Sequence, residues 1–164
     1  MRKLIVLFLL VALTGCSGNQ ILETVTDGNL EPVMAQAREL EMELPEEAAA
    51  YTVGGEGDRV YFCDGYSVVV QTMQAGDMDR TMRQISGFSK EALSVMETRQ
   101  EDAVRYDFAW SSVSDEGEMV CRTAMLDDGY YHYAVTVMAE YTQAGELSKQ
   151  WDDVLGSVRL SRTD

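Results

Sequence analysis

The pattern of apolar and polar residues changes several times along the chain, and most of it has the period of β-strands. Residues 104–110 place Val, Tyr, Phe and Trp at alternate positions, and residues 130–139 repeat this alternation. Alternation is typical of a strand with one buried face. The turn sequences Asp115-Glu116-Gly117 and Asp127-Asp128-Gly129 flank residues 119–126. Because such short turns join antiparallel neighbours, we predict an antiparallel meander of three strands.

A β-hairpin is predicted earlier in the chain. Asp64-Gly65 separates Val60-Tyr61-Phe62 from residues 66–73, which are rich in Val and aromatic residues. Asp-Gly between two apolar runs is a strong local signal for a two-residue hairpin turn. The glycines of residues 54–57 indicate a loop before the hairpin, because no helix or Lys follows them as a phosphate site would require.

Two segments have the period of amphipathic helices. The first follows Asp77, a favourable N-cap residue, and ends at Gly87. The second is predicted over about residues 144–155. Each has one apolar face, formed by Met78, Met82 and Ile85 in the first helix and by Leu147, Trp151, Val154 and Leu155 in the second.

Four further segments are less regular. Residues 30–38 contain Pro32 near their start and predict a short helix. Leu and Met alternate with Glu over residues 40–44, which predicts a strand, whereas residues 46–53 are ambiguous. Residues 157–161 predict a short closing strand. Together these elements predict an α+β fold with an antiparallel sheet of about six to seven strands and two main helices.

The first sixteen residues have the order of a secretory signal. Arg2 and Lys3 precede the apolar run 4–13, which is too short to span a bilayer. Residues Leu13-Thr14-Gly15-Cys16 resemble the lipobox of bacterial lipoproteins. The resemblance implies that Cys16 receives a diacylglyceryl thioether and that cleavage follows Gly15. We therefore expect a lipid-anchored protein of the cell membrane or outer membrane that faces outside the cytoplasm.

The lipobox also divides the chain. Residues 1–15 are the predicted signal peptide, and residues 16–29 are the lipidated Cys and a flexible tether, because few of them are apolar. Residues 30–161 are the predicted single globular domain. The expected partners are the membrane, bound through the lipid on Cys16, and, as a further candidate, a protein of the envelope.

The chain is strongly acidic, with 28 Asp and Glu against 13 Lys and Arg and a formal charge of −15. Cleavage before Cys16 would remove two cations and no acid. This charge opposes binding to nucleic acid, which needs cations at the phosphates. It indicates either a solvated surface or a docking face for a basic partner or divalent cations.

Cys63 and Cys121 remain once Cys16 is assigned to lipid. Both fall in predicted strands, and an extracytoplasmic compartment permits a disulfide. A free Cys also packs well as a small apolar residue. The spacing in the sequence leaves both alternatives open.

Catalytic and metal-binding patterns are largely absent from the sequence. His132 is the single histidine, and motifs of serine hydrolases, zinc peptidases, P-loops and EF-hands do not occur. Asp127-Asp128 suits a turn better than a calcium site. We therefore expect no enzyme, no metal and no cofactor, with His132 as a structural residue and a His132 hydrolase as the least favoured function.

An aromatic group in the predicted meander is the most suggestive feature for binding. Tyrosine combines apolar area with a polar tip and suits both sheet cores and recognition surfaces. The group contains Phe108 and five residues that form our candidate recognition surface, namely Tyr106, Trp110, Tyr130, Tyr131 and Tyr133.

The order of elements resembles the α/β sandwich of PsbP-like proteins and their bacterial lipoprotein relatives. Those proteins end in an amphipathic helix and an apolar strand, as residues 151–158, Trp-Asp-Asp-Val-Leu-Gly-Ser-Val, do here. The resemblance implies a binding or assembly role and no catalytic residues. The leading hypothesis is a non-catalytic binding module, and the alternative is a small-ligand carrier or sensor with a pocket between the sheet and the helices.

Overall fold

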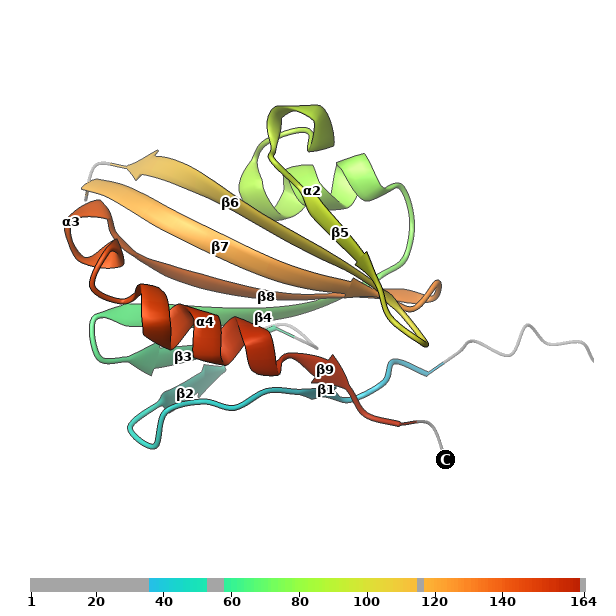
Figure 1. The fold of residues 1–164 in the computed structure, drawn as a ribbon, viewed down its shortest axis with the longest axis horizontal. Helices are drawn as coiled ribbons and strands as arrows, with labels where there is room; N and C mark the ends of the chain where they lie inside the picture. Colours follow the sequence, from blue (N-terminus) through green and yellow to red (C-terminus); the bar gives the residue numbers. More distant parts are fainter. Residues whose placement is uncertain (1–35, 53–57, 115–116, 163–164) are drawn as a thin grey trace, which may run out of the picture. The chain divides into compact units, whose positions relative to one another are not determined.

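A computed structural model of the chain describes residues 36–52, 58–114 and 117–162 (Figure 1). The predicted signal, Cys16, the tether and residues 54–57 lie outside the described residues. The described residues belong to one unit of the chain, residues 35–164. Residues 36–38 are not helical, so the end of the predicted first helix is wrong. No helix of the described part is both long and apolar enough to cross a membrane.

The fold is built on a seven-stranded antiparallel sheet, which confirms the predicted α+β class. Its strands follow the order β2-β3-β4-β8-β7-β6-β5, so β2 and β5 form its two edges. The predicted hairpin and meander supply the five inner strands. Their bounds are β3 Arg59–Cys63, β4 Tyr66–Gln74, β6 Val104–Ser114, β7 Gly117–Asp127 and β8 Tyr131–Glu140.

The edge strands are the part of the sheet that the sequence pattern does not identify. Strand β2 (Ala49–Thr52) comes from the ambiguous stretch, and β5 (Met96–Arg99) was not predicted. All four residues of β5 are exposed, so no alternation of buried and exposed positions marks it. An edge strand gains most of its stability from main-chain pairing, which leaves little pattern in the sequence.

One face of the sheet is covered along its length by the C-terminal elements. Helix α4 (Ser148–Ser157) packs Trp151, Val154 and Leu155 against buried residues of β4, β7 and β8. The short helix α3 (Tyr141–Ala144) precedes it, so the predicted single helix is two helices joined near Leu147. Figure 1 shows α4 lying along this face, with the small β1–β9 sheet at its end.

The two-stranded sheet closes the same layer. Strand β1 (Leu40–Glu41) pairs antiparallel with β9 (Arg159–Leu160), and both are shorter than the predicted strands. Met42 and Leu44 pack against the core without forming a strand. The guanidinium of Arg38 donates to the carbonyl of Ser161 and pairs with Asp102 at 2.6 Å, which fixes the entry of the chain.

The opposite face carries a second, smaller core. Helix α2 (Met78–Ser86) begins at Asp77, whose carboxylate accepts a 2.8 Å hydrogen bond from the backbone N–H of Arg80. It ends at Gly87, which has a positive φ of 82°, as predicted. Met82 packs among Tyr106, Phe108, Met125 and Ala134. The 3₁₀ turn η1 (Lys90–Ala92) follows the helix.

Candidate functional site

The aromatic group, for which the sequence left a sheet core and a recognition surface open, does not lie on one face. Residues that pair directly across antiparallel strands have their side chains on the same face of the sheet. Tyr106 pairs with Met125, and Met125 pairs with Ala134. All three pack against Met82 of α2, so Tyr106 lies on the α2 face. Tyr133 is fully buried on the α4 face, where Tyr131 contacts it at a ring distance of 6.1 Å. Tyr130 is exposed in the β7–β8 turn. The five aromatic residues are thus divided between two faces and one turn, and the core alternative holds for Tyr106 and Tyr133.

Trp110 is only half-buried and lies at the margin of the core beneath α2, where its indole N–H donates to the Thr123 hydroxyl. The register links five residues across β3, β4, β8, β7 and β6. We call this set the open row, and it consists of Phe62, Ser67, Met138, Cys121 and Trp110. Phe62 is 52% exposed, and Ser67, Met138 and Trp110 are half-buried. In Figure 1 α2 lies towards the other end of this face, and α3 lies at the strand ends on this side.

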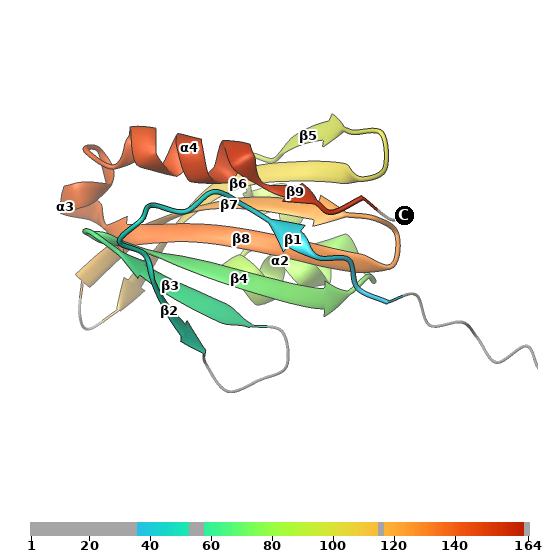
Figure 2. The same cartoon turned by 90° about the horizontal axis from the view of Figure 1, so that it is seen from below.

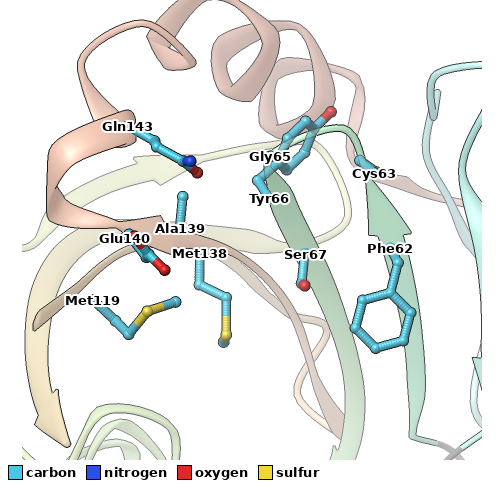
Figure 3. Close-up of a pocket in the computed structure, with 10 residues that line it drawn as sticks. All are labelled: Phe62, Cys63, Gly65, Tyr66, Ser67, Met119, Met138, Ala139, Glu140 and Gln143. Atoms are coloured by element: carbon cyan, nitrogen blue, oxygen red, sulfur yellow. The ribbon is translucent and has the colours of Figure 1, made fainter. Parts of the chain in front are cut away.

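A surface pocket of about 260 Å³ lies at the same end of the sheet (Figure 3). Phe62, Ser67 and Met138 of the open row line it together with Met119 of β7. In Figure 3 the two methionine side chains lie next to each other, and Phe62 lies beyond Ser67. The methionine side chain adapts its shape to different apolar partners, so this lining is suited to contact with the surface of another protein.

The charges around the open row are acidic. Glu140 lines the pocket, and Glu118 lies with it around a neighbouring depression of about 270 Å³ that includes the exposed Tyr141. Asp64 is exposed in the turn between β3 and β4. The open row itself contains no Lys or Arg. This end of the sheet therefore combines exposed apolar side chains with a negative rim.

The cysteines do not form the disulfide that the sequence left open. Cys63 and Cys121 are both free thiols. Strands β4 and β8 separate β3 from β7, a distance of about 14 Å at the usual strand spacing, whereas a disulfide needs Cα atoms within about 7 Å. Burial raises the pKa of Cys121 to about 11, so its thiol stays protonated at neutral pH. Burial also raises the pKa of Cys63.

His132 is fully buried beneath α2. Its Nδ1 lies 2.9 Å from the Thr81 hydroxyl, and its Nε2 lies 3.8 Å from a carboxylate oxygen of Asp127. Burial lowers the pKa of His132, although Asp127 and Asp128 oppose the shift. The Thr81 hydroxyl, the His132 imidazole and the Asp127 carboxylate thus lie in a row in space. The hydroxyl and the imidazole, however, are buried in the core. A substrate would have to displace α2 to reach them, so the arrangement fits a helix-to-sheet contact.

The acidic turn supports itself through hydrogen bonds. Asp127 accepts from the N–H of Gly129, and Asp128 accepts from the N–H groups of Tyr130 and Tyr131. The remaining oxygen of Asp128 accepts from the Tyr133 hydroxyl at 2.9 Å. These carboxylates therefore act as turn residues. Among the described residues, no group of three His, Cys, Asp or Glu side chains is arranged to hold a metal.

The space between the sheet and α4 is filled by side chains. Trp151 is 1% exposed and packs with Val154 and Leu155 against the sheet. These side chains occupy the space in which a small-ligand carrier would hold its ligand. A surface pocket of about 230 Å³ does lie beside α4, between residues 43–45 and Tyr66. The Tyr66 hydroxyl and the Trp151 indole N–H are buried without a hydrogen-bond partner.

No protein-family model and no curated protein matches the sequence. Solved structures do share the fold. CyanoP, the cyanobacterial PsbP of Synechocystis sp. PCC 6803, aligns with a TM-score of 0.52 and 12% identity over 82% of this chain and 98% of its own. LpqN of Mycobacterium tuberculosis, described as involved in cell envelope biogenesis, aligns with a TM-score of 0.51 and 8% identity over 77% and 85%.

A Bacteroides thetaiotaomicron protein has a TM-score of 0.52 and 9% identity over 75% of this chain, but the match spans only 45% of that protein. At these identities the likeness concerns the fold alone. The layout is PsbP-like, as the order of elements predicted.

Proposed function

We propose that this protein is a non-catalytic module of the cell envelope, anchored by lipid on Cys16, which binds an envelope protein through the open row. One observation carries the proposal. A soluble sheet normally covers its apolar faces, and here α2 leaves Phe62, Met138 and Trp110 in contact with solvent. Aromatic residues and methionine are enriched in the centres of protein interfaces.

The chemistry of the remaining groups supports a binding role over catalysis. The single histidine and its Thr81 partner are buried, and both described cysteines have raised thiol pKa values. The extracytoplasmic location is inferred from the lipobox resemblance. LpqN is described as involved in envelope biogenesis, and its shared fold agrees with an envelope role.

Site-specific photo-crosslinking in the host tests this proposal. A photoreactive residue at Phe62 or Met138 of the full chain should yield one adduct with an envelope protein. The matched control is Ala109, which is exposed on the opposite face of the same strand as Trp110. The adduct should disappear with Trp110→Glu in a protein of unchanged melting midpoint. An equal adduct from position 109, or none from positions 62 and 138, would refute the proposal.

A further inference from the structure

The two edges of the sheet differ in how they are protected. An edge strand presents unpaired main-chain N–H and C=O groups, which natural proteins usually guard with charges, Pro or bulges. Strand β5 carries Glu97 and Arg99. Strand β2 has the sequence Ala-Ala-Tyr-Thr, with no charge and no Pro, and Ala49, Ala50 and Tyr51 are exposed. Figure 2 shows β2 at the outer side of β3.

The register identifies which residue of β2 directs its backbone outward. Cys63 and Tyr66 close the two-residue turn of the β3–β4 hairpin, so this pair exchanges hydrogen bonds. The bonding direction alternates along each strand, which turns the backbone of Phe62 towards its β2 partner Ala49. The backbone N–H and C=O of Ala50 then point away from the sheet. When the same alternation is followed through the register from β4 to β5, the backbone N–H and C=O of Glu97 also point away from the sheet.

The side chains beside this edge form an apolar platform. Tyr51 is 61% exposed, and its ring lies 6.2 Å from that of Phe62 at an angle of 56°. Both rings lie on the same face as the rest of the open row, because Ala49 partners Phe62 and Tyr51 partners Val60. The edge and the open row are therefore one continuous surface.

The charge near this surface indicates what kind of strand would fit. Glu46 and Glu47 are exposed immediately before β2, neither β2 nor the open row contains Lys or Arg, and the exposed Arg59 of β3 lies at the other end of the strand, opposite Thr52. A segment carrying Lys or Arg complements these acids. A second copy of this chain would bring its own net charge of −15 against them, which disfavours self-pairing.

We propose that β2 accepts an extended segment of a partner protein as an added antiparallel or parallel strand. The segment alternates apolar residues, which contact Tyr51 and Phe62, with basic residues near Glu46 and Glu47. Main-chain hydrogen bonds would supply affinity and alternate side chains would supply selectivity, as in other strand additions. This inference rests on the proposed function and specifies how the partner is held.

The test uses the full chain, purified from membranes in detergent, and a nine-residue synthetic peptide that alternates Lys with Val or Phe. Binding should slow hydrogen exchange of the β2 amides and leave that of β5 unchanged. Ala50→Pro removes the outward N–H and should weaken binding at least tenfold. Ala50→Lys supplies the guarding charge and should do the same without a proline. Glu97→Pro in β5 is the matched control and should leave the affinity within twofold.

Two results separate this inference from the proposed function. Suppose that the peptide at millimolar concentration fails to protect β2, or that both Ala50 variants bind as well as wild type, while the adduct at position 62 still forms. The strand addition is then refuted and the binding role stands. A peptide in which Glu replaces Lys should bind at least tenfold more weakly, and equal binding would refute the basic character of the partner.

Discussion

Two buried tyrosines offer a matched test of how this core treats polar groups. Tyr66 and Tyr133 are 6% and 0% exposed and belong to the same core beneath α4. The Tyr133 hydroxyl accepts from the backbone N–H of Arg38 at 2.8 Å and donates to Asp128 at 2.9 Å. The Tyr66 hydroxyl lies beside the Cys63 thiol, a weak partner, and makes no hydrogen bond of normal geometry. We expect Phe substitutions at these positions to have opposite signs.

The magnitudes follow from these contacts. Tyr133→Phe removes a hydrogen bond to a carboxylate, worth about 1.5–3 kcal/mol, and leaves the Arg38 N–H without its acceptor. Tyr66→Phe removes a hydroxyl whose burial is uncompensated, and it should stabilise the domain by about 1 kcal/mol. At roughly 4 °C per kcal/mol for a domain of this size, the two melting midpoints should differ by on the order of 10 °C.

Urea and thermal unfolding of the two variants and wild type provide the measurement. The urea m-value should stay constant, so that the midpoint reports stability alone. If Tyr66→Phe lowered the midpoint as much as Tyr133→Phe, the Tyr66 hydroxyl would have a stabilising partner, and the packing of α4 near Cys63 would need revision. Cys63→Ala in the Tyr66→Phe background separates the contribution of the thiol.

Three further predictions concern the anchor, the core and the buried histidine. Cys16→Ala should abolish labelling with a radioactive fatty acid and release the protein from membranes, and equal labelling of mutant and wild type would refute the lipid anchor. Trp151→Ala should destabilise the domain by about 3–5 kcal/mol, because Trp151 is 1% exposed, whereas an unchanged melting midpoint would show that α4 does not depend on it. The pKa of His132 in the folded state is below its ordinary value of 6.5, so the unfolded chain binds the proton more tightly. Stability should therefore be full above about pH 6.5 and fall as the pH drops below it, and His132→Asn should lose this part of the dependence in urea unfolding.

The elements that the sequence predicts well are those whose pattern is set by burial. The alternation in β6 reflects one packed face, with Tyr106 and Phe108 buried and Ala109 exposed on the other side. The caps of α2 are the residues Asp77 and Gly87 that local chemistry requires. Strand β5 escapes notice because none of its residues is buried. The two-helix form of the C-terminal segment escapes notice because α3 has no buried residue to mark it.

The candidate site is harder to predict because it depends on register. Trp110 and Phe62 are 48 positions apart in the sequence, on strands separated by three others in the sheet. Only the pairing across β4, β8 and β7 places them in one row. The aromatic composition of the meander did indicate a binding feature, but period-two alternation divides Tyr133 and Tyr106 between opposite faces. Composition therefore named Trp110 as a candidate and could not identify its neighbours in the row.

The uncovered end of the sheet follows from the lengths of the elements. Helix α2 has nine residues, which span about 14 Å at 1.5 Å per residue. Strands β6 and β7 have 11 residues each, which span about 36 Å. A helix of that length covers less than half of such a face, and Asp77 and Gly87 fix both of its ends. On the other face, α4, α3 and the β1–β9 pair follow one another along the strands. The same sheet thus has one face closed by elements that follow one another along its strands and one face on which part of the apolar row stays exposed.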